Sequence, residues 1–126
     1  MSKKIFISQP KIFISQPMTN LNESEILSTR KKEIQYIKKH IKGAKIVGKY
    51  FNDATREYVE SFEQFDYIKN WDIYWLGRSI EELSKADVLW LCDGWEYSKG
   101  CKIELECAIS YGLKISYPPE RRNNGE

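Results

Sequence analysis

The stretch from residue 86 to residue 114 constrains the fold most, because a strand, a glycine-containing loop and a helix follow one another within it. The apolar run VLWLC at residues 88–92 is typical of a parallel strand that is covered on both faces. Apolar residues then recur at helical spacing up to Gly112, where a helix C-terminus is expected. The sequence therefore predicts a helix that places Glu104 near the end of the strand. The residues of this helix expected to face the core are Ile103, Cys107, Ala108 and Tyr111.

An identical seven-residue segment, KIFISQP, occurs twice in succession, at residues 4–10 and 11–17. Only the second copy leads directly into a helical pattern, which begins with the capping pair Asn22 and Glu25. The first central strand is therefore expected at Lys11–Ser15. The first copy is then a surplus tail, an edge strand, or a strand lent to a neighbouring subunit.

Helices and strands alternate along the rest of the chain. The expected elements are a helix to about residue 41, a strand at 44–51, a short helix within a loop at 52–70, a helix at 71–84 and a strand at 114–117. This order predicts an α/β fold, a small three-layer sandwich with a mainly parallel, flavodoxin- or Rossmann-like sheet. We expect one domain at residues 11–119, a surplus N-terminal segment at 1–10 and a polar tail at 120–126. In the helix at 71–84, the expected core face is Ile73, Leu76, Ile80 and Leu83.

The composition argues against several classes of function. The 126 residues carry a net charge of only +2, which offers no general attraction to a nucleic acid polymer. No apolar run is long enough to span a membrane, and the apolar part of MSKKIFISQP is too short for a signal peptide, so we expect a cytoplasmic protein, in the host cell if a phage encodes it. The three cysteines lack the spacing of metal ligands or of a disulfide framework, so we expect no metal and no cofactor. Cys101 is expected to be a partly exposed thiol.

In a fold of this kind the ligand site lies at the carboxyl ends of the strands. Helix N-terminal amides with the hydroxyl of Ser98 suit a phosphate group, and the flat surface of Trp95 suits a nucleobase. A carboxylate among them, Glu104, could attack an anomeric carbon. From spacing alone, Glu104 could equally be a solvated helix residue, and Trp95 a core or interface aromatic. The other candidate substrate-binding residues are Ser15, Gln16, Pro17, Met18, Asp93, Gly94 and Gly100.

Two segments, KIFISQPMTN at residues 11–20 and DGWEYSKGCKIELECAISYGLKI at residues 93–115, resemble the nucleoside 2-deoxyribosyltransferase-like superfamily. They are most similar to its short phage and bacterial branch, whose members carry I-S-x-P-M-T-G and G-W-E-x-S-x-G-A-x-x-E. The resemblance covers most of the chain and is vague between residues 51 and 71. It implies that Glu104 is the nucleophile, and that the site is completed across the subunits of a homo-oligomer, a dimer or larger.

Two serines depart from the pattern of the superfamily's transferases. Ser98 stands where the transferases carry an Asp. The branch that hydrolyses deoxynucleoside 5′-monophosphates also has a serine at this position, and that serine contacts the phosphate. Ser79 stands where the superfamily places an Asp on the preceding helix. The resemblance therefore implies a nucleotide ligand and the loss of an acid that positions or protonates the substrate. Residues that could compensate for that loss are Glu81, Glu82 and Asp93.

The sequence is consistent with two alternative functions. The first is an N-glycosidic bond hydrolase or (deoxy)ribosyltransferase that acts on a nucleotide or nucleoside, with Glu104 as the nucleophile. The second is a non-catalytic protein of phage type that sequesters a nucleotide or an ADP-ribose-like signal. Ser79 in place of an acid favours the binding protein, and Glu104 at the start of its helix favours the enzyme.

Overall fold

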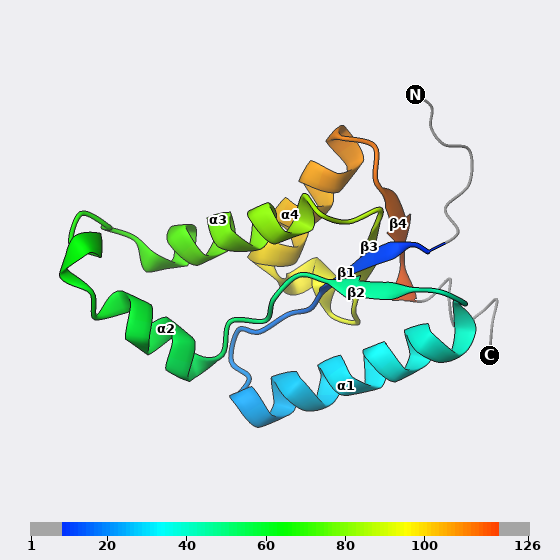
Figure 1. Ribbon diagram of the computed structural model, residues 1–126, viewed down its shortest axis with the longest axis horizontal. Coiled ribbons are helices and arrows are strands. Elements are labelled where there is room, and N and C mark those ends of the chain that lie inside the picture. The colour runs from blue at the N-terminus through cyan, green and yellow to red at the C-terminus, as the bar shows by residue number, and fades with distance from the viewer. Residues whose placement is uncertain (1–8, 119–126) are drawn as a thin grey trace.

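A four-stranded parallel sheet lies at the centre of the structure, a computed structural model that describes residues 9–118. The strands are β1 (Lys11–Ser15), β2 (Lys45–Val47), β3 (Val88–Leu91) and β4 (Lys114–Ser116). Their order is β2-β1-β3-β4, and each neighbouring pair is parallel (Figure 1). The predicted α/β fold is confirmed, and the sheet is parallel throughout.

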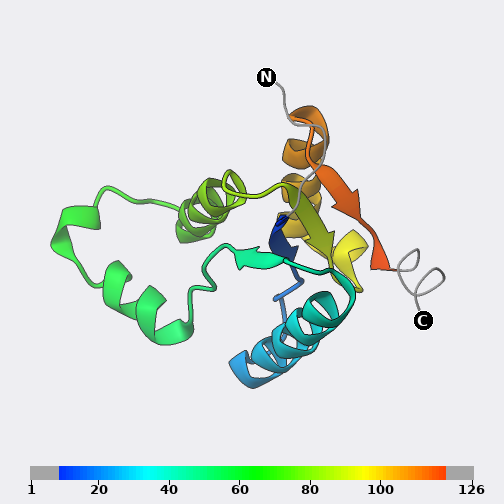
Figure 2. The same ribbon diagram turned by 45° about the vertical axis from the view of Figure 1, so that its right-hand side comes forward.

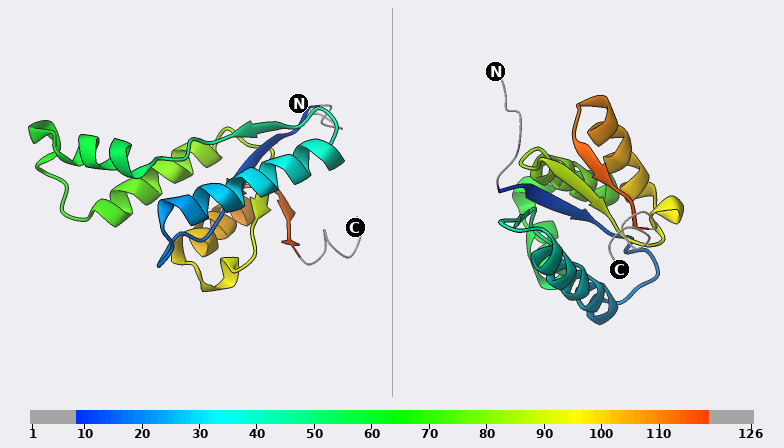
Figure 3. Two further views of the ribbon diagram at one scale, coloured as in Figure 1. Left: turned by 90° about the horizontal axis from the view of Figure 1, so that it is seen from below. Right: turned by 90° about the vertical axis from the view of Figure 1, so that its right-hand side faces the viewer.

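Helices cover both faces of the sheet. Helix α1 (Glu23–His40) lies on one face, and α3 (Trp71–Leu83) and α4 (Lys99–Ser110) lie on the other, so the molecule has three layers (Figure 3, right). Helix α2 (Asp53–Glu60) and the start of α3 extend away from the sheet (Figure 2). Two short 3-10 helices, η1 (Glu63–Phe65) and η2 (Trp95–Tyr97), lie in the connections.

Alternate strand residues pack into opposite layers, as the pleat requires. Phe13 and Leu89 pack with the α3 and α4 side chains Leu83 and Ala108. On the other face, Ile12, Ile14 and Trp90 pack with Ile37 of α1. Because both faces are covered, β3 and the middle of β1, Ile12–Ile14, are apolar on both faces, which is why their positions are readable from the sequence.

Local signals place the ends of the elements. Asn22 and Glu25 form a reciprocal capping box at the start of α1, with N–O distances of 2.8 and 2.9 Å. Gly112 has φ 82° directly after α4, as expected. Strand β2 is shorter than predicted, because Gly48 adopts φ +94° and turns the chain. A Cβ atom there would lie 2.7 Å from Cδ2 of Phe13.

The predicted core faces of α3 and α4 are wrong in part. Ile73 is 67% exposed and Tyr111 is 83% exposed, and Ile103 is also exposed. In α4 the positions that turn inward include Glu104 and Cys101, so Cys101 is buried and not partly exposed. Apolar periodicity misplaces these faces because polar side chains occupy inward positions.

Some predicted segments lie outside the described residues. These are the polar tail at 120–126 and the surplus segment at 1–10, apart from Gln9 and Pro10. The choice of the second KIFISQP copy as the central strand is confirmed, because β1 occupies Lys11–Ser15.

Two glycine substitutions test the backbone account of β2. Gly48→Ala introduces a positive-φ alanine and a contact with Phe13, so we expect it to lower the free energy of unfolding by about 2 kcal/mol or more. Gly77→Ala, within α3, meets no atom within 4 Å and should raise it by roughly 0.5–1 kcal/mol. Urea unfolding of both variants measures the difference. Equal stabilities would contradict the constraint at Gly48.

Candidate active site

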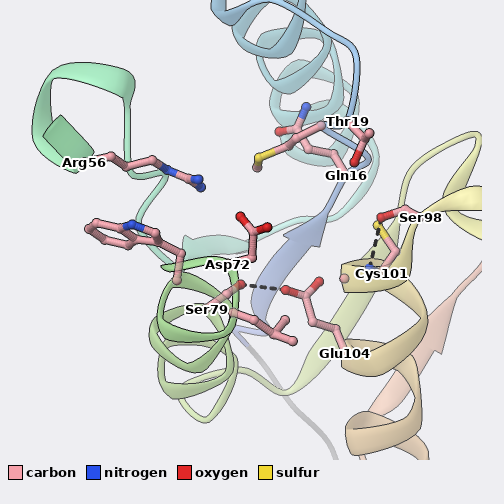
Figure 4. A pocket seen from close by; sticks show the side chains of 12 residues that line it. Gln16, Thr19, Arg56, Asp72, Ser79, Ser98, Cys101 and Glu104 are labelled. Carbon is pink, nitrogen blue, oxygen red and sulfur yellow. Dashed lines mark hydrogen bonds between the residues drawn. The ribbon is translucent and has the colours of Figure 1, made fainter. Parts of the chain in front are cut away.

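A cavity of about 240 Å³ lies at the carboxyl ends of β1 and β3, and we call it the main cavity (Figure 4). A side cavity of about 60 Å³ shares part of its lining and reaches toward α1 and the end of β2. The predicted site residues that line the main cavity are Gln16, Met18, Ser98, Gly100 and Glu104. The position agrees with the ligand site expected where the strand order reverses.

Glu104 projects from the second turn of α4 and is only 7% exposed. The hydroxyl of Ser15, the last residue of β1, donates a hydrogen bond of 2.6 Å to Oε1 of Glu104. The hydroxyl of Ser79, from α3, donates a second of 2.6 Å to Oε2. Both carboxylate oxygens are therefore held, and three elements of the fold meet at one side chain. Figure 4 shows the hydrogen bond between Ser79 and Glu104.

Burial and hydrogen bonding act in opposite directions on Glu104. Burial raises the pKa of Glu104, because the charged form loses its hydration, and the hydroxyl hydrogen bonds from Ser15 and Ser79 oppose this rise by favouring the carboxylate. The net effect is a raised pKa. A raised pKa on a cleft carboxylate is common at catalytic sites.

Ser98 lies across the main cavity from Ser79, as the N-cap of α4 (Figure 4). Its Oγ accepts a hydrogen bond of 3.2 Å from the amide of Cys101, and its side chain also hydrogen-bonds to the Cys101 thiol. Cys101 lines the cavity as well, but burial raises its thiol pKa. A neutral thiol is a poor nucleophile, so Glu104 is the better candidate for that role.

Gln16 lies between the main and side cavities and lines both. Its amide nitrogen donates to the carbonyl of Ile26 at 3.0 Å, which fixes the amide orientation because a carbonyl can only accept. The buried oxygen Oε1 of Gln16 has no hydrogen-bond partner. An unpaired buried acceptor costs free energy that a donor on a ligand could recover.

The wall opposite Glu104 comes from α2 and α3, and the sequence did not single it out. Arg56 donates from Nε to the carbonyl of Phe51 at 3.0 Å, and its guanidinium lies 5.3 Å from the Trp75 ring. The Trp75 indole donates to Glu60 at 2.7 Å. Asp72 lies on the same helix face, seven residues before Ser79. The residues missed at this site are Thr19, Arg56, Asp72, Trp75, Leu76 and Cys101, whereas Ser79 was already named as a departure from the superfamily's pattern.

The helical spacing of residues in α3 could have predicted part of this wall. Asp72, Trp75 and Ser79 stand at positions i, i+3 and i+7 of α3, so they share one face. That face was overlooked because Ile73, Leu76 and Ile80 form a competing apolar pattern one position away.

Five predicted site residues do not line either cavity. Ser15 lies behind Glu104 and acts on it through its hydroxyl. Gly94 lies close to Pro17, because a Cβ atom on Gly94 would be 3.5 Å from Cγ of Pro17. Trp95 is half-buried, with its ring 5.8 Å from that of Tyr117. The five are Ser15, Pro17, Asp93, Gly94 and Trp95.

The three acids proposed to compensate for Ser79 also lie outside the cavities. Glu81 is exposed and pairs with Arg78 at 3.5 Å. Glu82 is buried, accepts from the Lys49 amide at 3.1 Å and pairs with Lys85 at 3.0 Å. The carboxylate that lines the main cavity besides Glu104 is Asp72.

Residues 9–118 contain no group of three or more His, Cys, Asp and Glu side chains that could hold a metal ion. Within the same residues, no helix has the length and apolar character needed to cross a membrane.

Comparison with known proteins gives a family but no activity. A family described as a domain of unknown function (DUF4406) matches residues 10–117. The chain belongs to this family. No curated protein and no solved structure matches it. The family match covers every strand of the sheet and all the residues that line the two cavities.

Replacing Glu104 should stabilise the protein in a pH-dependent way. Because its folded-state pKa is raised, the stability that Glu104 contributes is present below its ordinary value near 4.5 and is lost as the pH rises through the folded pKa. Glu104→Gln stays neutral, so we expect its free energy of unfolding to exceed that of the wild type near pH 8, on the order of 1 kcal/mol. The difference should disappear at about pH 4.

Urea unfolding at several pH values measures this difference. Glu106→Gln is the matched control, because Glu106 is exposed on the same helix and should give no such pH-dependent gain. A Glu104→Gln variant that is less stable than the wild type at pH 8 would contradict the account of a buried, desolvated carboxylate.

Proposed function

We propose that this protein belongs to the nucleoside 2-deoxyribosyltransferase-like superfamily and cleaves the N-glycosidic bond of a nucleotide or nucleoside. The observation that carries the proposal is the buried carboxylate of Glu104, held from both sides by Ser15 and Ser79 at the edge of a cavity. A nucleophile needs to be held in one orientation, and two hydroxyl donors supply that constraint.

In the proposed reaction, an Oε atom of Glu104 attacks the anomeric carbon C1′ of the sugar. The C1′–O bond forms as the C1′–N bond breaks, and the electron pair of the broken bond goes to the base nitrogen, which takes up a proton from water. Water, or a second base in the transferase variant, then displaces Glu104 from C1′. The attack requires an ionised Glu104, so activity is expected above its raised pKa.

The size and lining of the main cavity suit a ligand of this class. Its volume of about 240 Å³ suits a small molecule better than a polymer. Trp75 offers a flat surface for a base, and Ser98 with the first amides of α4 offers donors to a phosphate group. We propose no metal or organic cofactor for the reaction, and a cytoplasmic homo-oligomer as the working state.

A specific observation also supports the non-catalytic alternative. Ser79 is a neutral hydroxyl that donates to Glu104, so α3 places no acid at this point of the site. In this alternative, the site lacks the acid beside Glu104 that would protonate the leaving base, and the cavity serves to sequester a nucleotide or an ADP-ribose-like signal.

Release of free base separates the two functions. We expect wild-type protein to release a base from one or more deoxynucleoside or ribonucleoside 5′-monophosphates, and Glu104→Ala to reduce the rate by at least about 10³-fold. Chromatography of the incubated nucleotides measures the product. Glu106→Ala is the control, because this exposed residue on the same helix should leave the rate unchanged. A nucleotide recovered unchanged from heat-denatured wild-type protein, with no turnover of any substrate, would favour the binding protein.

Ser79→Ala tests how Glu104 is tuned. The Ser79 hydroxyl lowers the pKa of Glu104, so its removal should raise that pKa. Because the nucleophile must be ionised, we expect the acidic limb of the pH–rate profile to move to higher pH. Steady-state rates measured across the pH range check this. A profile that keeps its position while the rate falls at every pH would contradict the tuning role.

A further inference from the structure

The side cavity contains positive charge that the proposed reaction does not use. Arg30 of α1 and Arg56 of α2 both line it, together with Lys49 and Tyr50. We propose that the side cavity is an anion-binding subsite, in which Arg30 and Arg56 hold an oxyanion of the ligand. The inference deepens the proposed function and rests on it for the nucleotide identity of the ligand.

Within residues 9–118, Arg30 forms no ion pair with a carboxylate. It is half-buried, and its Nη2 atom donates to the carbonyl of Gly48 at 3.1 Å. Burial lowers the pKa of Arg30, and the nearby Cys92 and Tyr50 offset this only in part. An incompletely compensated guanidinium favours an anion beside it, because an anion would stabilise the charge that burial disfavours.

Arg56 lines the same cavity and comes from a different helix, α2. Its described partners are the carbonyl of Phe51 and the face of Trp75, neither of which carries a negative charge. The ion pairs within residues 9–118 join Arg78 to Glu81 and Lys85 to Glu82.

The surroundings of the two arginines are consistent with a shared anion. Tyr50 lines the side cavity together with Arg30 and Arg56, and it interacts electrostatically with each of them. Glu23 and Asp53 are the carboxylates near Tyr50, and neither lines the side cavity. The two cations therefore meet in a space whose lining includes no carboxylate other than Glu104.

The chemistry and the volume both indicate an oxyanion. Each guanidinium has five N–H donors in a planar fork, and one of them on each arginine is used by a carbonyl in the contacts above. The remaining donors match the oxygens of a phosphate or carboxylate group, which arginine binds in bidentate fashion. The side cavity, of about 60 Å³, is much smaller than the main cavity of about 240 Å³, which suits a small group such as an oxyanion better than a base or a sugar.

The subsite is separate from the phosphate position expected at Ser98. Ser98 lines the main cavity only, and Arg30 lines the side cavity only. Glu104 and Gln16 line both, so they lie at the junction. The unpaired acceptor Oε1 of Gln16 is a second, independent sign that a ligand crosses this junction, and it requires an N–H or O–H donor on that ligand.

The oxyanion has two chemical sources, which are a phosphoryl group carried by the nucleotide and a separate phosphate ion. Isothermal titration of the Glu104→Gln protein with deoxynucleosides, with their 5′-monophosphates and with inorganic phosphate distinguishes them, since this background prevents turnover. We expect the monophosphates to bind at least about tenfold more tightly than the nucleosides. Arg30→Gln and Arg56→Gln, each added to this background, should each abolish that advantage.

Lys31→Gln is the matched control, because it removes the same charge from an exposed neighbour of Arg30 on α1. Ser98→Ala tests the alternative phosphate position at the start of α4, and this variant should still bind the monophosphates more tightly than the nucleosides. If inorganic phosphate binds in an arginine-dependent way while nucleosides and monophosphates bind equally, the subsite stands and takes a separate ion. Thermal unfolding of each unliganded variant checks that it is folded, and two arginine variants keep the test valid if one is not.

The subsite is overturned if both arginine variants keep the advantage of the monophosphates, or if Ser98→Ala alone removes it. It is also overturned if no phosphate-containing probe binds more tightly than its nucleoside and inorganic phosphate does not bind. These results are independent of catalysis. Arginine-dependent phosphate binding by a wild-type protein that releases no base would support the subsite and contradict the proposed glycosidase activity.

Discussion

The arrangement of the site depends on one buried carboxylate, Glu104, and on the two hydroxyls that hold it. Ser15 ends β1 and Ser79 lies on α3, so a single side chain of α4 connects the central strand with both helices of one layer. Each hydrogen bond is short, as expected when the acceptor is charged. Burial of this group costs stability that an apolar residue would not cost, and such a cost is common where a site serves function.

The sheet was predictable because its strands are apolar on both faces. The positions of β1 and β3, and the capping box at Asn22, follow from short runs of sequence whose physical meaning is local. The length of β2 was not predictable, because the strand ends where Gly48 adopts a positive φ beside Phe13 of the neighbouring strand, where a Cβ atom would not fit. Contacts of that kind join residues that are far apart in the chain.

The sequence predicted only the part of the site that the strand ends and α4 contribute. The strand-end rule and the helix start at Ser98 place Glu104, Gln16 and Met18 at the main cavity. They could not place Arg56, because the segment that carries α2 contains no strand to fix its position. They could not place Trp75, because the apolar pattern of α3 pointed to a neighbouring face. Inward-facing polar residues also disturb the apolar periodicity from which helix faces are inferred, so such reasoning fails most where function is located.

Helix α2 brings Arg56 to both cavities, although it contributes little to the core. None of its residues is buried, so the helix adds little to the stability of the core. It is held instead by contacts to Trp75, which donates to Glu60 and lies beneath the guanidinium of Arg56. Those same contacts place Arg56 at both cavities. An element that buries almost nothing and positions a cation at the site is what the proposed anion-binding subsite requires.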